Sequence, residues 1–142
     1  MKRNNSINYN LKFEFNSGEE LLTISKNQNV SIPELIYENE NTISPNLDIS
    51  KNLMKIWGTM NECINRGVNS KATLPGKLKV NRRAPKLHEL LIKEGKNNPL
   101  NIMDWVNMWA IAVNEENASG GKIVTAPTNG AAGIIPAVIK YY

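Results

Sequence analysis

Residues 101–117 read NIMDWVNMWAIAVNEEN and form the most apolar helix-like stretch of the 142-residue chain. The apolar side chains are Ile102, Trp105, Val106, Met108, Trp109, Ala112 and Val113, and they cover more than one face of a helix. A helix of this kind is usually buried in a larger helical body. The stretch therefore predicts a mainly α fold in which residues 101–117 pack on several sides.

A loop rich in small residues follows this helix after Gly120 and Gly121. It reads TAPTNGAAG from Thr125 to Gly133. Gly and Asn tolerate positive φ and let the backbone approach a ligand closely. A helix that begins near Ala131 would direct its free N–H groups at the loop, which suits a carboxylate or phosphate. The loop is not a P-loop, because the Gly-Lys-Ser/Thr ending is absent. It predicts either a substrate-binding loop or a structural connection between two helices.

The N-terminal part predicts an extended segment and two capped helices. Residues 1–16 are expected to be an extended or disordered lead-in, because Leu11, Phe13 and Phe15 alternate with polar residues. The pairs Ser17 with Glu20 and Ser31 with Glu34 have capping-box spacing. They predict one helix to about residue 26 and a second that ends near residue 41.

Two further helices are predicted between these and the apolar stretch. Apolar residues recur at helical spacing from Ile49 to Ile64, with Asp48 or Ser50 as the cap and Gly67 as the C-terminal stop. A shorter helix is expected over residues 85–94, ended by Gly95.

The charge pattern is mildly basic, with a formal net charge of +4. Residues 71–86 contain the basic run Lys77, Lys79, Arg82, Arg83 and Lys86 without an acidic residue. Such a run is usually a solvated loop or helix flank, and it can also bind nucleic acid. Because no aromatic side chains are interleaved for base stacking, a nucleic-acid partner is not expected. The triplet Glu115-Glu116-Asn117 is left with three roles: capping, pairing with this run, or lining the site.

Metal-binding residue types are scarce. Cys63 is the single cysteine, so the chain alone can hold neither a disulfide nor a multi-cysteine cluster, which needs about three or four thiolates. Cys63 is expected to be a small buried apolar residue. His88 is the single histidine and is expected at the surface or the core edge. No apolar run of about 18 residues and no secretory signal occurs, so we expect no membrane partner and a cytoplasmic location.

Four segments together resemble one enzyme family. They are MDWVNMWAIAVNEENASGGKIVTAPTNGAAGIIPAVIKYY (residues 103–142), SGEELLTISKNQNVSIPELIYENE (17–40), IWGTMNECINRGV (56–68) and LPGKLKVNRRAP (74–85). In their order along the chain they resemble the bacterial iron–sulfur L-serine dehydratases, also called L-serine ammonia-lyases. The resemblance covers the end of the β-to-α connection and the start of the α domain. Residues 17–142 are thus expected to be the N-terminal portion of a truncated, all-helical α domain.

The resemblance implies a lyase of amino-acid catabolism and gluconeogenesis that converts L-serine to pyruvate and ammonia. Intact members join a β domain to the α domain and bind a [4Fe–4S] cluster. One iron of that cluster acts as a Lewis acid on the substrate hydroxyl. The expected partners of this chain are therefore L-serine, the missing C-terminal half of the α domain, and the β domain.

The resemblance gives candidate loop residues but no catalytic residue. Thr125, Thr128, Asn129, Gly130 and Gly133 are expected to face substrate or cluster. Ala132 stands where many members have a cluster-ligating cysteine, so this chain has no metal ligand of its own.

Two functional interpretations remain open from the sequence. In the first, the chain is part of an L-serine ammonia-lyase and is inactive alone. In the second, it is the non-catalytic product of a truncated or split gene.

Overall fold

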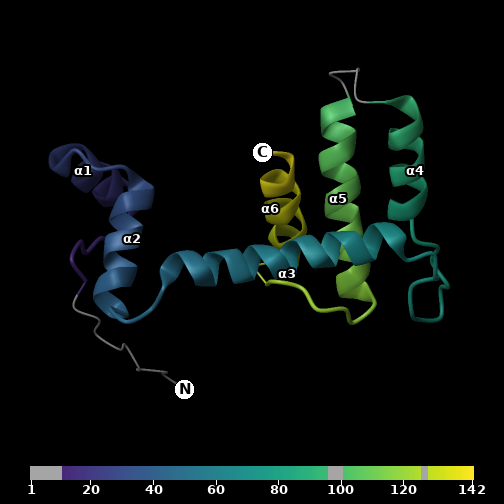
Figure 1. Ribbon diagram of the computed structural model, residues 1–142, viewed down its shortest axis with the longest axis horizontal. Helices are drawn as coiled ribbons and strands as arrows, with labels where there is room; N and C mark the ends of the chain where they lie inside the picture. Colours follow the sequence, from purple (N-terminus) through teal and green to yellow (C-terminus); the bar gives the residue numbers. More distant parts are fainter. Residues whose placement is uncertain (1–10, 96–100, 126–127) are drawn as a thin grey trace. The chain divides into compact units, whose positions relative to one another are not determined.

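The computed structural model describes residues 11–95, 101–125 and 128–142, which divide into two compact units (Figure 1). The first unit ends at Leu53 and the second runs from Met54 to Tyr142. These residues form six α-helices, and the β structure among them is limited to one isolated bridge between Thr73 and Asn81. The predicted mainly α fold is confirmed. The expected start of the α domain at residue 17 stays a prediction.

The described part of the lead-in, residues 11–16, forms neither helix nor strand, and its expected extended or disordered character stays a prediction. Leu11, Phe13 and Phe15 are half-buried and the residues between them are exposed. The backbone of Phe13 is hydrogen-bonded to a side chain of α2 (Ile32–Ile43) and not to a strand. Its N–H donates to Asn39 Oδ1 at 2.8 Å, and Asn39 Nδ2 donates to the Phe13 carbonyl at 2.8 Å. Residues 1–10 of the predicted lead-in lie outside the described residues.

Helices α1 (Gly18–Gln28) and α2 (Ile32–Ile43) begin at the two predicted caps. The Ser31 hydroxyl accepts from Glu34 N–H while the Glu34 carboxylate accepts from Ser31 N–H, which completes a capping box. At α1 the reciprocal bond is displaced by one residue, since Glu20 accepts from Asn16 N–H at 2.6 Å. Both helix starts are therefore fixed by local hydrogen bonds.

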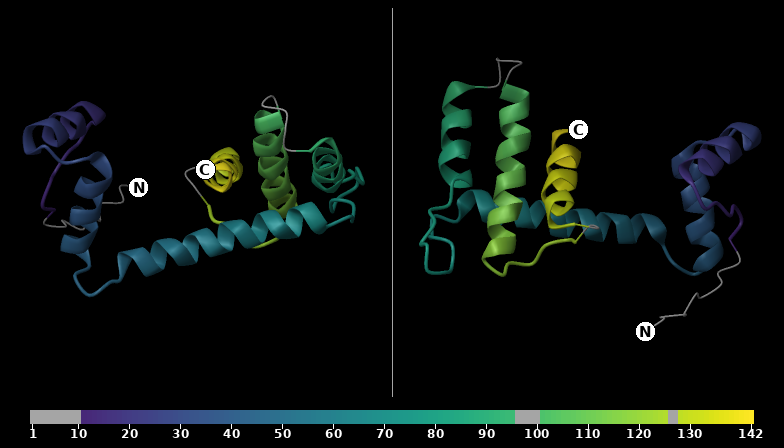
Figure 2. Two further views of the ribbon diagram at one scale, coloured as in Figure 1. Left: turned by 45° about the horizontal axis from the view of Figure 1, so that its top comes forward. Right: turned by 180° about the vertical axis from the view of Figure 1, so that it is seen from behind.

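The second unit contains most of α3 (Ile49–Asn69), with α4 (Ala84–Glu94), α5 (Asn101–Ala118) and α6 (Asn129–Tyr141). Helices α4 and α5 run antiparallel, α6 packs against α5 at an angle, and the C-terminal half of α3 crosses near the end of α5 (Figures 1 and 2). The core side chains are Cys63, Ile64 and Val68 of α3, Ala84 and Leu91 of α4, and Met108, Ala112 and Val113 of α5. The apolar stretch that predicted the fold, in α5, thus packs against side chains of α3 and α4.

One predicted helix end is wrong. Gly67 was expected to stop the third helix, but α3 continues to Asn69. A Cβ built on Gly67 would lie only 2.5 Å from the Ala112 carbonyl oxygen. Gly67 is therefore a site of close contact between α3 and α5 and not a C-cap, because a larger side chain would hold the two backbones apart.

Candidate functional site

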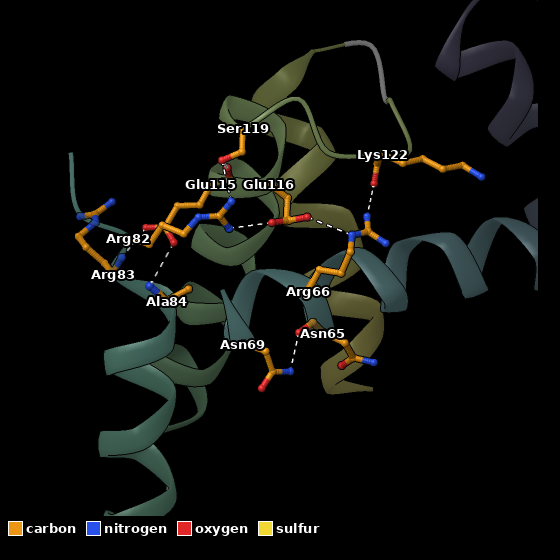
Figure 3. A network of polar contacts seen from close by, with 10 residues as sticks. All are labelled: Asn65, Arg66, Asn69, Arg82, Arg83, Ala84, Glu115, Glu116, Ser119 and Lys122. Atoms are coloured by element: carbon orange, nitrogen blue, oxygen red, sulfur yellow. Dashed lines mark hydrogen bonds and ion pairs between the residues drawn. The ribbon is translucent and has the colours of Figure 1, made fainter. Parts of the chain in front are cut away.

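The entry to the predicted loop contacts a part-buried polar network (Figure 3). Glu116 near the end of α5 accepts from Arg82 Nη1 at 2.7 Å and from Arg66 Nε at 3.0 Å. Arg66 Nη2 also donates to the Lys122 carbonyl at 2.6 Å. Because Lys122 precedes Thr125 by three residues, this contact fixes the chain that leads into the loop.

The same network joins α4 to α5. Glu115 accepts from the backbone N–H of Arg83 at 2.7 Å and of Ala84 at 3.3 Å, so it caps the start of α4. Carboxylates are favourable there because the N–H groups of a first helical turn lack partners in the helix. Of the three roles left open for Glu115 and Glu116, the structure shows two: capping, and pairing with the basic run.

Two glycines after α5 make space for this arrangement. Gly120 has φ of 75°, in the left-handed region, and follows the end of α5. Gly121 N–H donates to the Glu116 carbonyl at 2.8 Å. A Cβ on Gly121 would lie 2.8 Å from Glu116 Oε2. A side chain at position 121 would therefore displace the carboxylate that binds both arginines.

The exit of the loop is fixed by α6. Thr128 is the N-cap, and its hydroxyl accepts from Ala131 N–H at 3.2 Å. Gly133 is buried against α5, where a Cβ would meet the Ala110 carbonyl and the Asn114 amide at 3.1 Å. This contact gives Gly133 a packing role.

The predicted site residues fall into two environments. Thr125, Thr128 and Gly130 are exposed, whereas Gly133 is buried. Asn129 is the first residue of α6, two residues earlier than the predicted helix start. Ala126 and Pro127, in the middle of the loop, lie outside the described residues. The structure therefore places the loop between a fixed entry and a fixed exit, with several candidates open to solvent.

Metal ligands are not assembled among the described residues: they contain no group of three or more His, Cys, Asp or Glu side chains placed to hold a metal ion. Cys63 is buried in the core as predicted, and burial raises the pKa of its thiol. His88 is half-buried, with its ring edge-on to Trp105 at 5.9 Å. Ala132, for which the resemblance implies a cysteine in many family members, is 3% exposed.

Some contacts around the loop were not predicted from the sequence. The basic run that contains Arg82 was one expected partner of Glu116, but Arg66, 50 residues from Glu116, was not. Asn114 beside Gly133 also carried no signal, because it is one of many asparagines in the chain. Such pairs are defined by helix packing.

The helices and the loop lie in a region of the chain that matches a known family. The family model described as serine dehydratase alpha chain matches residues 27–142, which include α2 to α6 and the loop. The chain belongs to the serine dehydratase alpha chain family. The match confirms the resemblance on which the candidate loop residues were chosen.

Full-length relatives of the family are much longer. L-serine dehydratase 1 of Escherichia coli is 47% identical over 92% of this chain, and an L-serine dehydratase of Streptomyces coelicolor is 48% identical over 93%. An L-serine dehydratase of Helicobacter pylori is 42% identical over 94%. The chain spans about 29% of the first two relatives and 30% of the third.

In the described part of the chain, no helix is both long enough and apolar enough to cross a membrane.

Proposed function

We propose that this chain forms part of an L-serine ammonia-lyase, which converts L-serine to pyruvate and ammonia by iron-assisted dehydration, and that it is inactive alone. The observation that carries the proposal is the family match, which includes the loop and its supporting helices. The proposed partners are L-serine, the remainder of the α chain, and the β domain. The proposed setting is cytoplasmic amino-acid catabolism that supplies gluconeogenesis.

The loop geometry supports a role in binding the substrate. Thr128 lies at the N-terminus of α6, where first-turn N–H groups have no acceptor within the helix. That end of a helix favours an anion such as the carboxylate of serine. Thr125 and Thr128 are exposed and offer hydroxyl groups on both sides of residues 126–127. We assign them, with Asn129 and Gly130, to the surface that holds and orients the substrate.

The residues of this chain do not fit a [4Fe–4S] cluster on their own. The sequence has one cysteine, and Cys63 faces the helical core, 1% exposed, with a raised thiol pKa that disfavours the thiolate form needed by iron. Ala132 has no ligating atom. The cluster therefore belongs to the proposed complementary polypeptide, and no reaction step is assigned to Cys63.

The alternative is a non-catalytic product of a truncated or split gene. The single cysteine and Ala132 fit either function. The alternative predicts that no complementary polypeptide restores activity.

An anaerobic serine dehydratase assay after iron–sulfur reconstitution separates the two functions. The chain is assayed with and without the part of E. coli L-serine dehydratase 1 that follows the matching segment, together with its β domain. Pyruvate formed only in the complete mixture supports the proposal. Absence of pyruvate in every mixture, beside an active intact enzyme, supports the alternative. Pyruvate from the chain alone would contradict both.

A matched pair of variants tests the loop in the active mixture. Thr125→Val removes an exposed hydroxyl while the residue keeps its shape, and we expect KM for serine to rise by roughly tenfold if the hydroxyl contacts substrate. Thr73→Val makes the same change at an exposed position before α4, outside the candidate loop, and should leave KM unchanged. Equal KM values for both variants would remove Thr125 from the proposed site.

A further inference from the structure

The outward face of α6 is apolar and exposed. It consists of Ile134, Ile135, Val138, Ile139 and Tyr141, with exposed fractions from 40% to 57%. The opposite face, which includes Ala132, Pro136 and Ala137, is buried. Lys140 is half-buried, with its ammonium group over the ring of Trp109 at 5.9 Å. The α6 outward face is therefore a continuous apolar strip along the helix.

This surface lacks the usual features of a solvent-facing helix. Surface helices normally place charged or polar residues opposite the core, and an apolar helix is normally covered on all sides. Contiguous exposed apolar patches mark an interaction site or an aggregation hazard. The composition of α6 therefore requires a second covering layer in addition to α5.

The length of the relatives indicates what that layer is. The family match extends through α6, and full-length relatives contain more than three times as much polypeptide as this chain. We infer that the α6 outward face is the docking surface for the part of the serine dehydratase alpha chain that follows the matching segment. The inference rests on the proposed function, because it assumes that such a polypeptide completes the domain.

A second copy of this chain is a weaker occupant. Helix α6 has 13 residues and is therefore only about 20 Å long. Two such strips in contact would bury well below the roughly 1,200 Å² of total surface found in specific stable interfaces. A complementary domain half can also contact neighbouring surfaces, so it is not limited to one helix.

Co-expression tests this surface directly. The chain is produced with a tagged segment of E. coli L-serine dehydratase 1, the part that follows the matching region, and the amount that co-purifies is measured. The test variant carries Ile134→Asp and Val138→Asp, at positions 57% and 50% exposed. The matched control carries Ile92→Asp and Leu90→Asp on α4, at positions 58% and 46% exposed. Circular dichroism checks that both variants keep their helix content.

We expect the unmodified chain and the α4 variant to co-purify with the segment within about twofold of each other, and the α6 variant to lose at least about tenfold. Equal capture of both variants, or no capture of the unmodified chain, would overturn the inference. So would a dimer of the chain that the α6 substitutions dissociate and the segment does not displace.

The readout is binding and not pyruvate, so its result is separable from that of the proposed function. A pair that assembles but forms no pyruvate would support the docking surface and contradict the proposed activity. A pair that forms pyruvate and assembles equally well with the α6 substitutions would support the activity and contradict the docking surface.

Discussion

Glu116 is the residue on which the polar contacts of the second unit converge. Its side chain is 8% exposed and pairs with Arg82, which is 6% exposed, and with the more open Arg66. Arg82 Nε is buried without a partner among the described residues. Removal of one partner from a buried ion pair leaves the other charge without compensation, which is far more damaging than loss of an exposed pair.

We predict that Glu116→Gln lowers the free energy of unfolding by about 3 kcal/mol, because Arg82 stays buried beside a neutral amide. Urea unfolding measures this difference. Glu89→Gln is the matched control, since Glu89 pairs with Lys71 at the exposed surface. The control should leave the urea midpoint nearly unchanged. Equal shifts for both variants would contradict the structural role of Glu116.

The same carboxylate predicts a pH dependence of stability. Burial of Glu116 raises the pKa of its carboxyl, but the hydrogen bonds and charges of Arg82 and Arg66 outweigh burial and hold the pKa below its ordinary value of 4.5. A carboxyl whose pKa is lower in the folded state stabilises the fold. This stabilisation is fully present above the unfolded-state pKa and is lost as the pH falls through the folded-state pKa. We therefore expect the free energy of unfolding to fall below about pH 4.5. Urea unfolding across this range should show a weaker fall for Glu116→Gln.

Gly67 allows a direct test of the close contact between α3 and α5. We predict that Gly67→Ala destabilises the chain by about 1–3 kcal/mol, because the new methyl group would overlap the Ala112 carbonyl. Gly58→Ala is the same change in the same helix with nothing within 4 Å of the new Cβ. It should stabilise by about 0.5–1 kcal/mol through helix propensity. Urea unfolding that gave the same sign for both variants would refute the close contact.

At the scale of the element, α6 joins the candidate site to the docking surface. Its first turn begins beside the loop at Thr128, its inner face packs on α5 through Gly133, and its outer face is apolar. Pro136 lies inside the helix and is buried. Its ring removes one backbone hydrogen bond, so α6 depends on packing and capping more than an uninterrupted helix does.

The cap of α6 is therefore expected to matter. We predict that Thr128→Ala destabilises α6 by about 1 kcal/mol, because Ala131 N–H loses its acceptor. Thr128→Ser retains a hydroxyl and should preserve the cap. Amide hydrogen exchange of residues 131–135 measures the difference locally. Identical exchange in the alanine and serine variants would mean that the hydroxyl does not cap the helix.

At the scale of the whole chain, many apolar side chains are exposed to solvent. Besides the α6 outward face, Met103 at the start of α5 is 65% exposed and Ile102 is 39% exposed. The apolar stretch at residues 101–117 and helix α6 thus both have exposed apolar side chains. This fits a chain that spans 29% of its full-length relatives.

We predict that the chain expressed alone binds a fluorescent apolar-surface dye and associates as its concentration rises, because exposed apolar patches promote association. Dye fluorescence and sedimentation over a concentration series measure this. The Ile134→Asp, Val138→Asp variant should reduce both signals relative to the Ile92→Asp, Leu90→Asp control. A monomer with a sharp thermal transition and no dye binding would contradict the prediction.

The sequence by itself determined the features that depend on neighbours in the chain. The caps at Ser17 and Ser31, the stop at Gly95 and the helix over residues 101–117 were predicted because capping and helical periodicity act over three or four residues. The family, and with it the candidate loop, was also readable from contiguous segments. The ligand roles of Thr125, Thr128, Asn129, Gly130 and Gly133 stay predictions.

Only the tertiary structure decided the features that join distant parts of the chain. It paired Glu116 with Arg66 and Arg82, chose capping of α4 for Glu115, and changed Gly67 from a helix stop to a contact with α5. It also separated the buried face of α6 from the exposed one. These outcomes depend on which helix faces lie against each other, and one sequence carries no local signal for that choice.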